Sequence, residues 1–265
     1  MRKRKNKIPA VYLLPNIVTL AAMFCGFYSI ISAITGMYIQ SAIFVLFAMV
    51  LDGLDGRVAR LTNTQTSFGE YFDSLSDLLC FGIAPALLIY LSSLSMMASG
   101  YLAKISYIAC FVYIASAAIR LARFNSRNQT TDKKYFVGLA SPASAAILIC
   151  YVWLLNDISA NMSSYLYLTL ILLLSLSILM VSNIAYFSFK DLNIKQKVPH
   201  LMLFGAALIV SFISFDPPKV LFIFFLLYGL SGPSMFLIRR LRRNGIYETN
   251  LATKVEDKEN QKHGS

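Results

Sequence analysis

Residues 17–34, with the sequence IVTLAAMFCGFYSIISAI, contain no charged side chain. A helix needs about 20 predominantly apolar residues to cross the ~30 Å hydrocarbon core of a bilayer. Residues 164–189 and 220–238 are of the same character. The sequence therefore predicts several membrane-spanning helices.

The composition favours the same class. Of the 265 residues, 57% are hydrophobic and only 14% are charged, which is too little charge to cover a soluble domain. Hydropathy divides the chain into the apolar segments 12–35, 38–61, 67–95, 100–125, 138–156, 163–189, 198–215 and 218–241. We expect an all-α, polytopic membrane protein with about eight transmembrane helices. Residues 1–245 would form the membrane domain, and residues 246–265 a polar, disordered cytoplasmic tail.

Basic residues gather on alternate connections between these segments. The connections near residues 36, 98, 158 and 216 contain almost no Lys or Arg, whereas the other connections and both termini are rich in them. Cytoplasmic loops have this positive-inside pattern, so we expect both termini in the cytoplasm and the protein in the cell (inner) membrane. The pattern also explains the net charge of +11 without a nucleic-acid partner.

Several acidic residues lie inside apolar segments, where a carboxylate costs at least a few kcal/mol and usually marks function. They are Asp52, Asp55, Glu70, Asp73 and Asp77. The spacings of Asp52 to Asp55 and of Asp73 to Asp77 put each pair on one helix face. A short turn at residues 61–66 makes the two helices antiparallel, so at ~1.5 Å per residue Asp55 lies level with Asp73. Asp52 and Asp77 match one turn deeper, so four carboxylates should face one another.

Four carboxylates at close range require positive charge. The only basic residues near them in sequence are Arg57 and Arg60, so bound divalent ions neutralise them better. Oxygen ligands without His or Cys favour Mg²⁺, with Mn²⁺ or Ca²⁺ as alternatives. Two layers of carboxylates suit two ions that clamp a diphosphate. The predicted metal ligands are Asp52, Asp55, Asp73 and Asp77.

Small residues accompany the aspartates. Gly56 and Ala59 continue the face of the first pair, and Gly69 precedes Asp73 by one turn. Missing side chains let a ligand approach the backbone, and Arg60 can pair with a phosphate. Small residues also serve helix packing in membranes. Each residue alone fits either role, but beside four aspartates the set favours ligand binding.

The order of these residues resembles the signature of the CDP-alcohol phosphotransferase family. The pattern D-x2-D-G-x2-A-R, a spacer of eight residues and G-x3-D-x3-D are complete between Asp52 and Asp77. The resemblance implies that the four aspartates bind two divalent metals and that Asp77 is the general base. It also implies residues that shape the site for the CDP moiety, namely Gly56, Ala59, Arg60 and Gly69.

Further stretches within residues 10–145 are similar to the phosphatidylserine synthase branch of this family. They are LPN at 14–16 with Thr19, FGIAP at 81–85, IRLARFN at 119–125 and FVGLASP at 136–142. Cys80, where Ser is common, and Ala140, where Pro is usual, depart from the branch pattern. The last four segments are similar in hydropathy only. The resemblance implies CDP-diacylglycerol and L-serine as substrates, and a homodimer.

The branch stretches add candidate binding residues. Arginines at a cytoplasmic helix end are commonly topology anchors, but with the resemblance we favour Arg120 and Arg123 for holding the serine carboxylate or a phosphate. Asn125 would add an amide. Asn16 and Thr19 either line the CDP-diacylglycerol site or cap the first helix, and the sequence leaves both roles open.

The expected reaction is a direct displacement at the cytoplasmic face. Asp77 takes the proton of the serine hydroxyl, and attack at the phosphatidyl phosphorus gives phosphatidylserine and CMP. A sister enzyme that uses glycerol 3-phosphate or inositol phosphate is an alternative, although an anionic acceptor should need a larger basic cluster. A cation transporter is a second alternative, but no second acidic helix pair follows in residues 138–241, as repeated halves would require.

Overall fold

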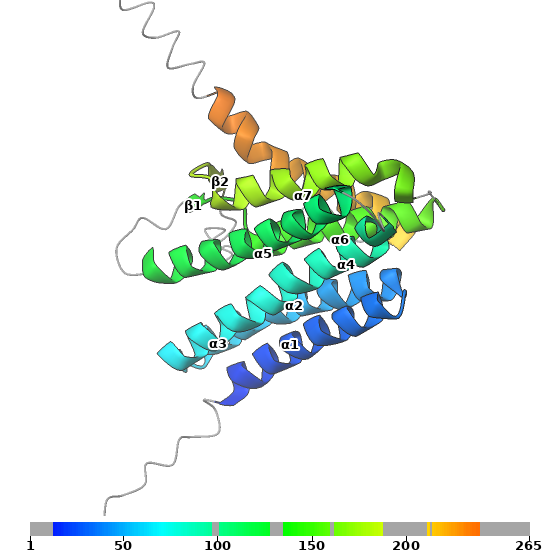
Figure 1. Ribbon diagram of the computed structural model, residues 1–265. Helices are drawn as coiled ribbons and strands as arrows, with labels where there is room; N and C mark the ends of the chain where they lie inside the picture. Colours follow the sequence, from blue (N-terminus) through cyan, green and yellow to red (C-terminus); the bar gives the residue numbers. More distant parts are fainter. Residues whose placement is uncertain are drawn as a thin grey trace, which may run out of the picture.

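The computed structural model describes residues 13–96, 101–127, 135–159, 162–187, 211–212 and 214–238. Within these ranges the fold is a helical bundle with one small sheet (Figure 1). The helices are α1 (Leu13–Ile34), α2 (Tyr38–Leu61), α3 (Ser67–Asp77), α4 (Ala84–Ser92), α5 (Tyr101–Arg127), α6 (Ser141–Asp157), α7 (Leu166–Val181) and a last helix, Pro217–Ile238. Strands β1 (Tyr135–Val137) and β2 (Ala185–Phe187) pair antiparallel, and they are the exception to the all-α class among the described residues.

Among the described residues, four helices are long and apolar enough to cross a membrane. They are Leu13–Ile34, Ser67–Ser92, Tyr101–Ser126 and Pro217–Ile238, and they agree with the predicted class of helical membrane protein. The helix predicted over 198–215 lies almost entirely outside the described residues, as do both chain ends and the predicted tail. The number of spans, the side of the termini and the boundary at residue 245 therefore stay predictions.

The span Ser67–Ser92 is continuous from α3 to α4 through a π-helical turn, Leu78–Ile83. Pro85 has no N–H, so the Phe81 carbonyl lacks its ordinary α-helical donor four residues on. The hydroxyl of Tyr113, from α5, donates to that carbonyl at 3.1 Å. Turns of this type are frequent at functional sites, and this one begins directly after Asp77.

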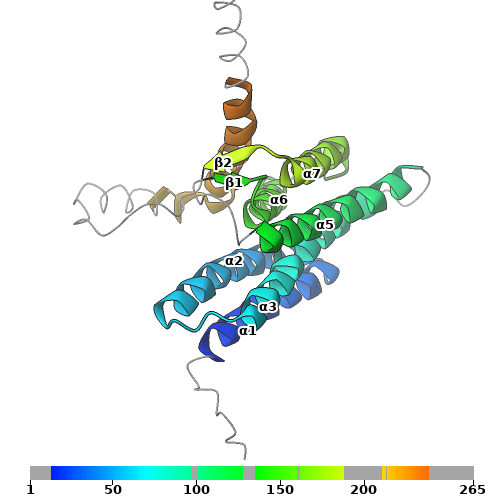
Figure 2. The same cartoon turned by 90° about the vertical axis from the view of Figure 1, so that its left-hand side faces the viewer.

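Helix α1 packs closely against α2 and α3 (Figure 2). A Cβ on Gly26 would lie 2.6 Å from Cys80 Sγ. Helix α1 and the π-helical turn that contains Cys80 can therefore approach this closely only because residue 26 is glycine. The Cys80 thiol donates to the Ala22 carbonyl at 3.3 Å, and Ser29 and Ser41 join α1 to α2 at 2.9 Å. Small residues at membrane-helix contacts serve this purpose.

Helix α6 occupies the centre of the bundle. Most of its side chains are buried, and it contacts α2, α4 and α7. Gly138 precedes it with φ +84°, and the N–H groups of Gly138 and Leu139 donate to the carbonyls of Ile184 and Leu179. The start of α6 is thereby tied to the end of α7.

Two predicted helices differ from the observed ones at the sheet. The prediction of a helix over 163–189 is wrong beyond Val181, because Ser182 is extended and residues 185–187 pair with 135–137. The helix predicted from residue 138 begins at Ser141, after the turn at Gly138. A short apolar run such as residues 185–187 does not by itself distinguish a buried strand from a helix.

The backbone turn at Gly138 gives a test of the fold. A Cβ there would collide with the Met180 carbonyl, whereas Gly36, with a similar φ of +78°, has open space around it. We expect Gly138→Ala to lower the free energy of unfolding by about 3 kcal/mol, through strain plus overlap, and Gly36→Ala by about 1 kcal/mol, through strain alone. Thermal melting of the two purified variants compares them. Equal melting temperatures would contradict the proposed contact.

Candidate metal and substrate site

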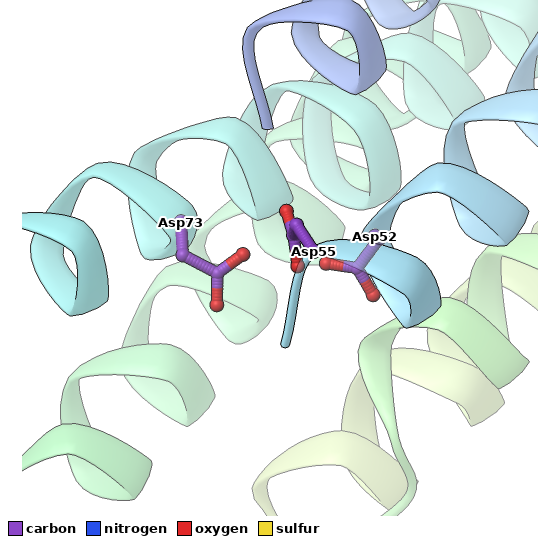
Figure 3. Close-up of side chains that lie close together, drawn as sticks. All are labelled: Asp52, Asp55 and Asp73. Atoms are coloured by element: carbon purple, nitrogen blue, oxygen red, sulfur yellow. The ribbon is translucent and has the colours of Figure 1, made fainter. Parts of the chain in front are cut away.

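Three carboxylates converge where the end of α2 meets α3. Asp52 and Asp55 come from α2 and Asp73 from α3, and each offers an oxygen within 4.8 Å of the others (Figure 3). Asp55 is 5% exposed and the other two are half-buried. The short connection at residues 62–66 makes the helix pair antiparallel and brings the three side chains together.

Asp77 lies one turn further along α3, outside this triple. Its carboxylate interacts with those of Asp52 and Asp73, and Asp52 is within hydrogen-bonding reach of both. Carboxylates in such contact must share a proton or a cation. All four predicted ligands therefore belong to one electrostatic cluster.

The cluster fits a divalent cation. Within the described ranges, Asp73 Oδ1 is buried and has no hydrogen-bond partner, which is a costly state for a carboxylate oxygen. Every donor in the triple is a carboxylate, the ligand type that Mg²⁺, Mn²⁺ and Ca²⁺ prefer. Arg57 and Arg60 are exposed. The residues present are thus suited to hold a hard divalent ion.

Helix α1 orients one of the carboxylates. The hydroxyl of Thr19 lies 2.7 Å from Asp55 Oδ2 and 3.1 Å from its own-helix acceptor, the Pro15 carbonyl. Thr19 is 4% exposed and lies inside α1, which begins at Leu13. It therefore does not cap the helix. Its contact is of the kind that fixes metal ligands from outside the coordination sphere.

The glycines of the motif have different surroundings. A Cβ added to Gly53 or Gly56 would meet nothing within 4 Å, so space is open beside the α2 aspartates. A Cβ on Gly69 would lie 3.2 Å from Thr66 Oγ1 and 3.4 Å from Asn16 Oδ1. The Gly69 N–H also donates to Thr66 Oγ1, which caps α3. Gly56 thus leaves room for a ligand, whereas Gly69 serves the packing of α1 on α3.

Two other predicted CDP-site residues lie on the last turns of α2. Ala59 is half-buried and Arg60 is exposed. Within the described residues, the Arg60 side chain is therefore not buried in the protein core.

Arg120, on α5, extends the site beyond the aspartates. Its Nη1 donates to Ser141 Oγ at 2.7 Å, and its charge interacts with Asp77. In the part of the chain that the structure describes, Arg120 Nε is buried without a partner. A guanidinium with an unused buried donor is suited to a carboxylate or phosphate ligand.

The other two residues predicted with Arg120 make protein contacts. Arg123 Nη1 donates to the Val181 carbonyl at 3.0 Å and so caps the end of α7. The Asn125 amide donates to Ser74 Oγ at 2.9 Å, next to Asp73. The charge of Arg120 thus acts on Asp77, whereas Arg123 and Asn125 make contacts that hold α7 and α3.

Comparison with known proteins identifies the family. The family model described as CDP-alcohol phosphatidyltransferase matches residues 12–181. The chain belongs to the CDP-alcohol phosphatidyltransferase family. The match contains all four aspartates and ends with α7, so the last helix lies beyond this family domain.

Relatives within this family share one name, CDP-diacylglycerol–serine O-phosphatidyltransferase. The Helicobacter pylori (strain 26695) protein is 37% identical over 85% of this chain and 91% of its own length. The Mycobacterium leprae protein is 30% identical, with 79% and 71% covered. The Methanocaldococcus jannaschii protein is 32% identical, with 60% and 69% covered.

Three residues around Arg120 were not singled out from the sequence: Tyr113, Ser141 and Tyr228. Tyr113 and Tyr228 interact with the Arg120 charge, and Ser141 binds it directly. Ser141 lies in the stretch FVGLASP, but nothing in a serine or an isolated tyrosine within an apolar helix predicts its partner.

The Thr19 contact yields a prediction for metal binding. Thr19→Val keeps the side-chain volume but removes the hydroxyl from Asp55, so we expect the Mn²⁺ or Mg²⁺ concentration for half-maximal activity to rise about tenfold. The control is Thr35→Val, directly after α1, whose hydroxyl donates to the carbonyls of Ile31 and Ser32. A metal titration that is unchanged in Thr19→Val would show that Asp55 needs no such support.

Proposed function

We propose that the protein is a CDP-diacylglycerol–serine O-phosphatidyltransferase. It transfers the phosphatidyl group of CDP-diacylglycerol to the hydroxyl of L-serine and releases CMP. The main support for the proposal is that Asp52, Asp55 and Asp73, three aspartates of the family motif, come together in the structure. The substrate pair comes from the name of the H. pylori relative, which aligns with 85% of the chain.

The cofactor is a pair of divalent ions, Mg²⁺ or Mn²⁺, with Ca²⁺ as an alternative. Asp52, Asp55, Asp73 and Asp77 would hold them. Bound there, the ions would neutralise the diphosphate and stabilise the CMP leaving group. The buried, unpartnered oxygen of Asp73 supports this assignment.

Asp77 is the proposed general base. It accepts the proton of the serine hydroxyl as that oxygen bonds to the phosphatidyl phosphorus, while the bond from phosphorus to the CMP oxygen breaks. CMP leaves with the electron pair of that bond. The position of Asp77 at the edge of the carboxylate triple, toward Arg120, supports this role.

Arg120 is the proposed partner of the serine carboxylate. The guanidinium interacts electrostatically with Asp77 and has a buried donor without a partner among the described residues. A small zwitterion bound there would bring its hydroxyl near the base. Because Arg123 already caps α7, the site offers less positive charge than a phosphorylated alcohol would need. Arg123 and Asn125 would support the acceptor site by holding α7 and α3 in place.

The CDP moiety would occupy the open end of the site. Gly56, Ala59, Arg60 and Gly69 would shape it, with Asn16 beside Gly69 and Thr19 behind Asp55. The start of α1, the α2–α3 connection and the end of α5 lie at one end of the bundle (Figure 1). We propose that this end faces the cytoplasm, in an inner-membrane protein of eight spans that acts as a homodimer.

A product assay tests the reaction. Purified protein is incubated with CDP-diacylglycerol and either serine, glycerol 3-phosphate or inositol phosphate, with Mg²⁺, Mn²⁺ or EDTA. We expect phosphatidylserine and CMP with serine and a divalent ion, and no turnover in EDTA. A different lipid product with serine inert would assign another acceptor, and turnover that survives EDTA would remove the metal role.

Two aspartate variants separate binding from chemistry. Asp77→Asn should reduce turnover by at least about 100-fold, the usual contribution of a general base, with much of the CDP-diacylglycerol binding retained. Asp52→Ala should lose metal and nucleotide binding together, because Asp52 contacts both carboxylates of α3. Asp157→Asn, an exposed carboxylate on α6, is the control. Near wild-type turnover in Asp77→Asn would refute its role as base.

A further inference from the structure

The hydroxyl of Ser141 binds a charged side chain of another helix. Helix α6 begins at Ser141, and Ala140, its N-cap residue, has no side chain that could cap it. A serine at the start of a helix commonly accepts a hydrogen bond from the first N–H groups of its own helix. The Ser141 hydroxyl instead accepts from Nη1 of Arg120, on α5, at 2.7 Å. Local capping therefore does not account for this hydroxyl.

The backbone that precedes Ser141 fixes its position. The N–H groups of Gly138 and Leu139 donate to the carbonyls of Ile184 and Leu179, at 2.8 and 3.0 Å. These hydrogen bonds join the start of α6 to the end of α7 and to the residue before β2. Ser141 itself is fully buried. Its hydroxyl is thus held in place by contacts that do not involve α5.

Helix α5 is tied to the same backbone one turn after Arg120. Arg123 Nη1 donates to the Val181 carbonyl at 3.0 Å and to Asn183 Oδ1 at 3.4 Å. Together with the bond from Arg120 to Ser141 and the backbone bonds at the start of α6, these contacts close a ring that joins α5, α6 and α7. Arg123 therefore holds the backbone from which the Arg120 side chain extends, and Ser141 holds the far end of that side chain.

The Arg120 guanidinium keeps binding capacity after this contact. Its charge acts on Asp77, and within the described residues its Nε is buried without a partner. An arginine side chain has many rotamers, and its planar guanidinium binds a carboxylate or phosphate well only in a matching orientation. One fixed acceptor at Nη1 selects among these orientations.

We propose that Ser141 is a positioning residue, whose hydroxyl holds the Arg120 guanidinium in the orientation that receives the carboxylate of the acceptor serine. The turn at Gly138 and the strand pair, which fix Ser141, would thereby contribute to the affinity for the acceptor. This inference rests on the proposed function, because it uses the assignment of Arg120 to the serine carboxylate.

The test uses the full chain and the variant Ser141→Ala. We expect the KM for serine to rise about tenfold, as for the loss of a hydrogen bond to a charged group, while the KM for CDP-diacylglycerol stays the same. Ser141→Cys, which keeps the shape of the side chain but offers a weaker acceptor, should raise the same KM.

Tyr151→Phe is the matched control. The Tyr151 hydroxyl lies 2.9 Å from Thr169 Oγ1 and joins α6 to α7 in the buried core. Both Ser141→Ala and Tyr151→Phe remove a hydrogen bond between α6 and a neighbouring helix, and both should lower the melting temperature. Only Ser141→Ala should change the KM for serine. An equal rise in the two variants, or an equal rise for both substrates in Ser141→Ala, would mean a general structural role and would overturn the inference.

A double-mutant cycle with Arg120→Lys decides whether Ser141 acts through the arginine. If it does, Ser141→Ala adds less than about twofold to the serine KM in the Arg120→Lys background. An unchanged serine KM in Ser141→Ala alone, or a full tenfold effect in that background, also overturns the inference. Wild-type protein that forms no phosphatidylserine would instead overturn the proposed function.

Discussion

Electrostatic repulsion between carboxylates is the constraint on which this structure depends. Asp52 lies within reach of both Asp73 and Asp77, in a bundle whose described part includes four long apolar helices. Such a group of acids is tolerated only with a compensating cation and with side chains that hold each oxygen in place. Thr19 on α1 and Asn125 on α5, which binds Ser74 next to Asp73, supply that support from two other helices.

The surrounding helices serve this arrangement in different ways. Helices α2 and α3 carry the acidic residues, here called the acidic wall, and α1 packs against both, with a glycine where α1 approaches Cys80 and open space at the glycines beside the α2 aspartates. Helices α5 and α6 supply the basic wall, where Arg120 and Ser141 meet. The strand pair and the turn at Gly138 fix α6 against α7 and hence fix Ser141. A site between opposite charges is thereby built from segments that are far apart in sequence.

Much of the acidic wall was predictable, because its information is local. The intervals from Asp52 to Asp55 and from Asp73 to Asp77, joined by a short turn, leave little freedom in how the two faces meet. The contact of Thr19 with Asp55 spans 36 residues and has no local signal. The same holds for the strand at 185–187, whose apolar residues follow α7 after only two polar residues, Ser182 and Asn183. Long-range packing decides such features, and it cannot be predicted from a single sequence.

The π-helical turn after Asp77 has a consequence for the two halves of the span Ser67–Ser92. One additional residue in a helix rotates everything after it by about 100°. Leu78–Ile83 therefore sets the angular phase of α4 independently of that of α3. The first half can aim acids into a polar site while the second half turns Leu88 and Ile89 into the apolar core. A regular α-helix of the same sequence would turn α4 by about that angle relative to α3 and so change which of its side chains face the core.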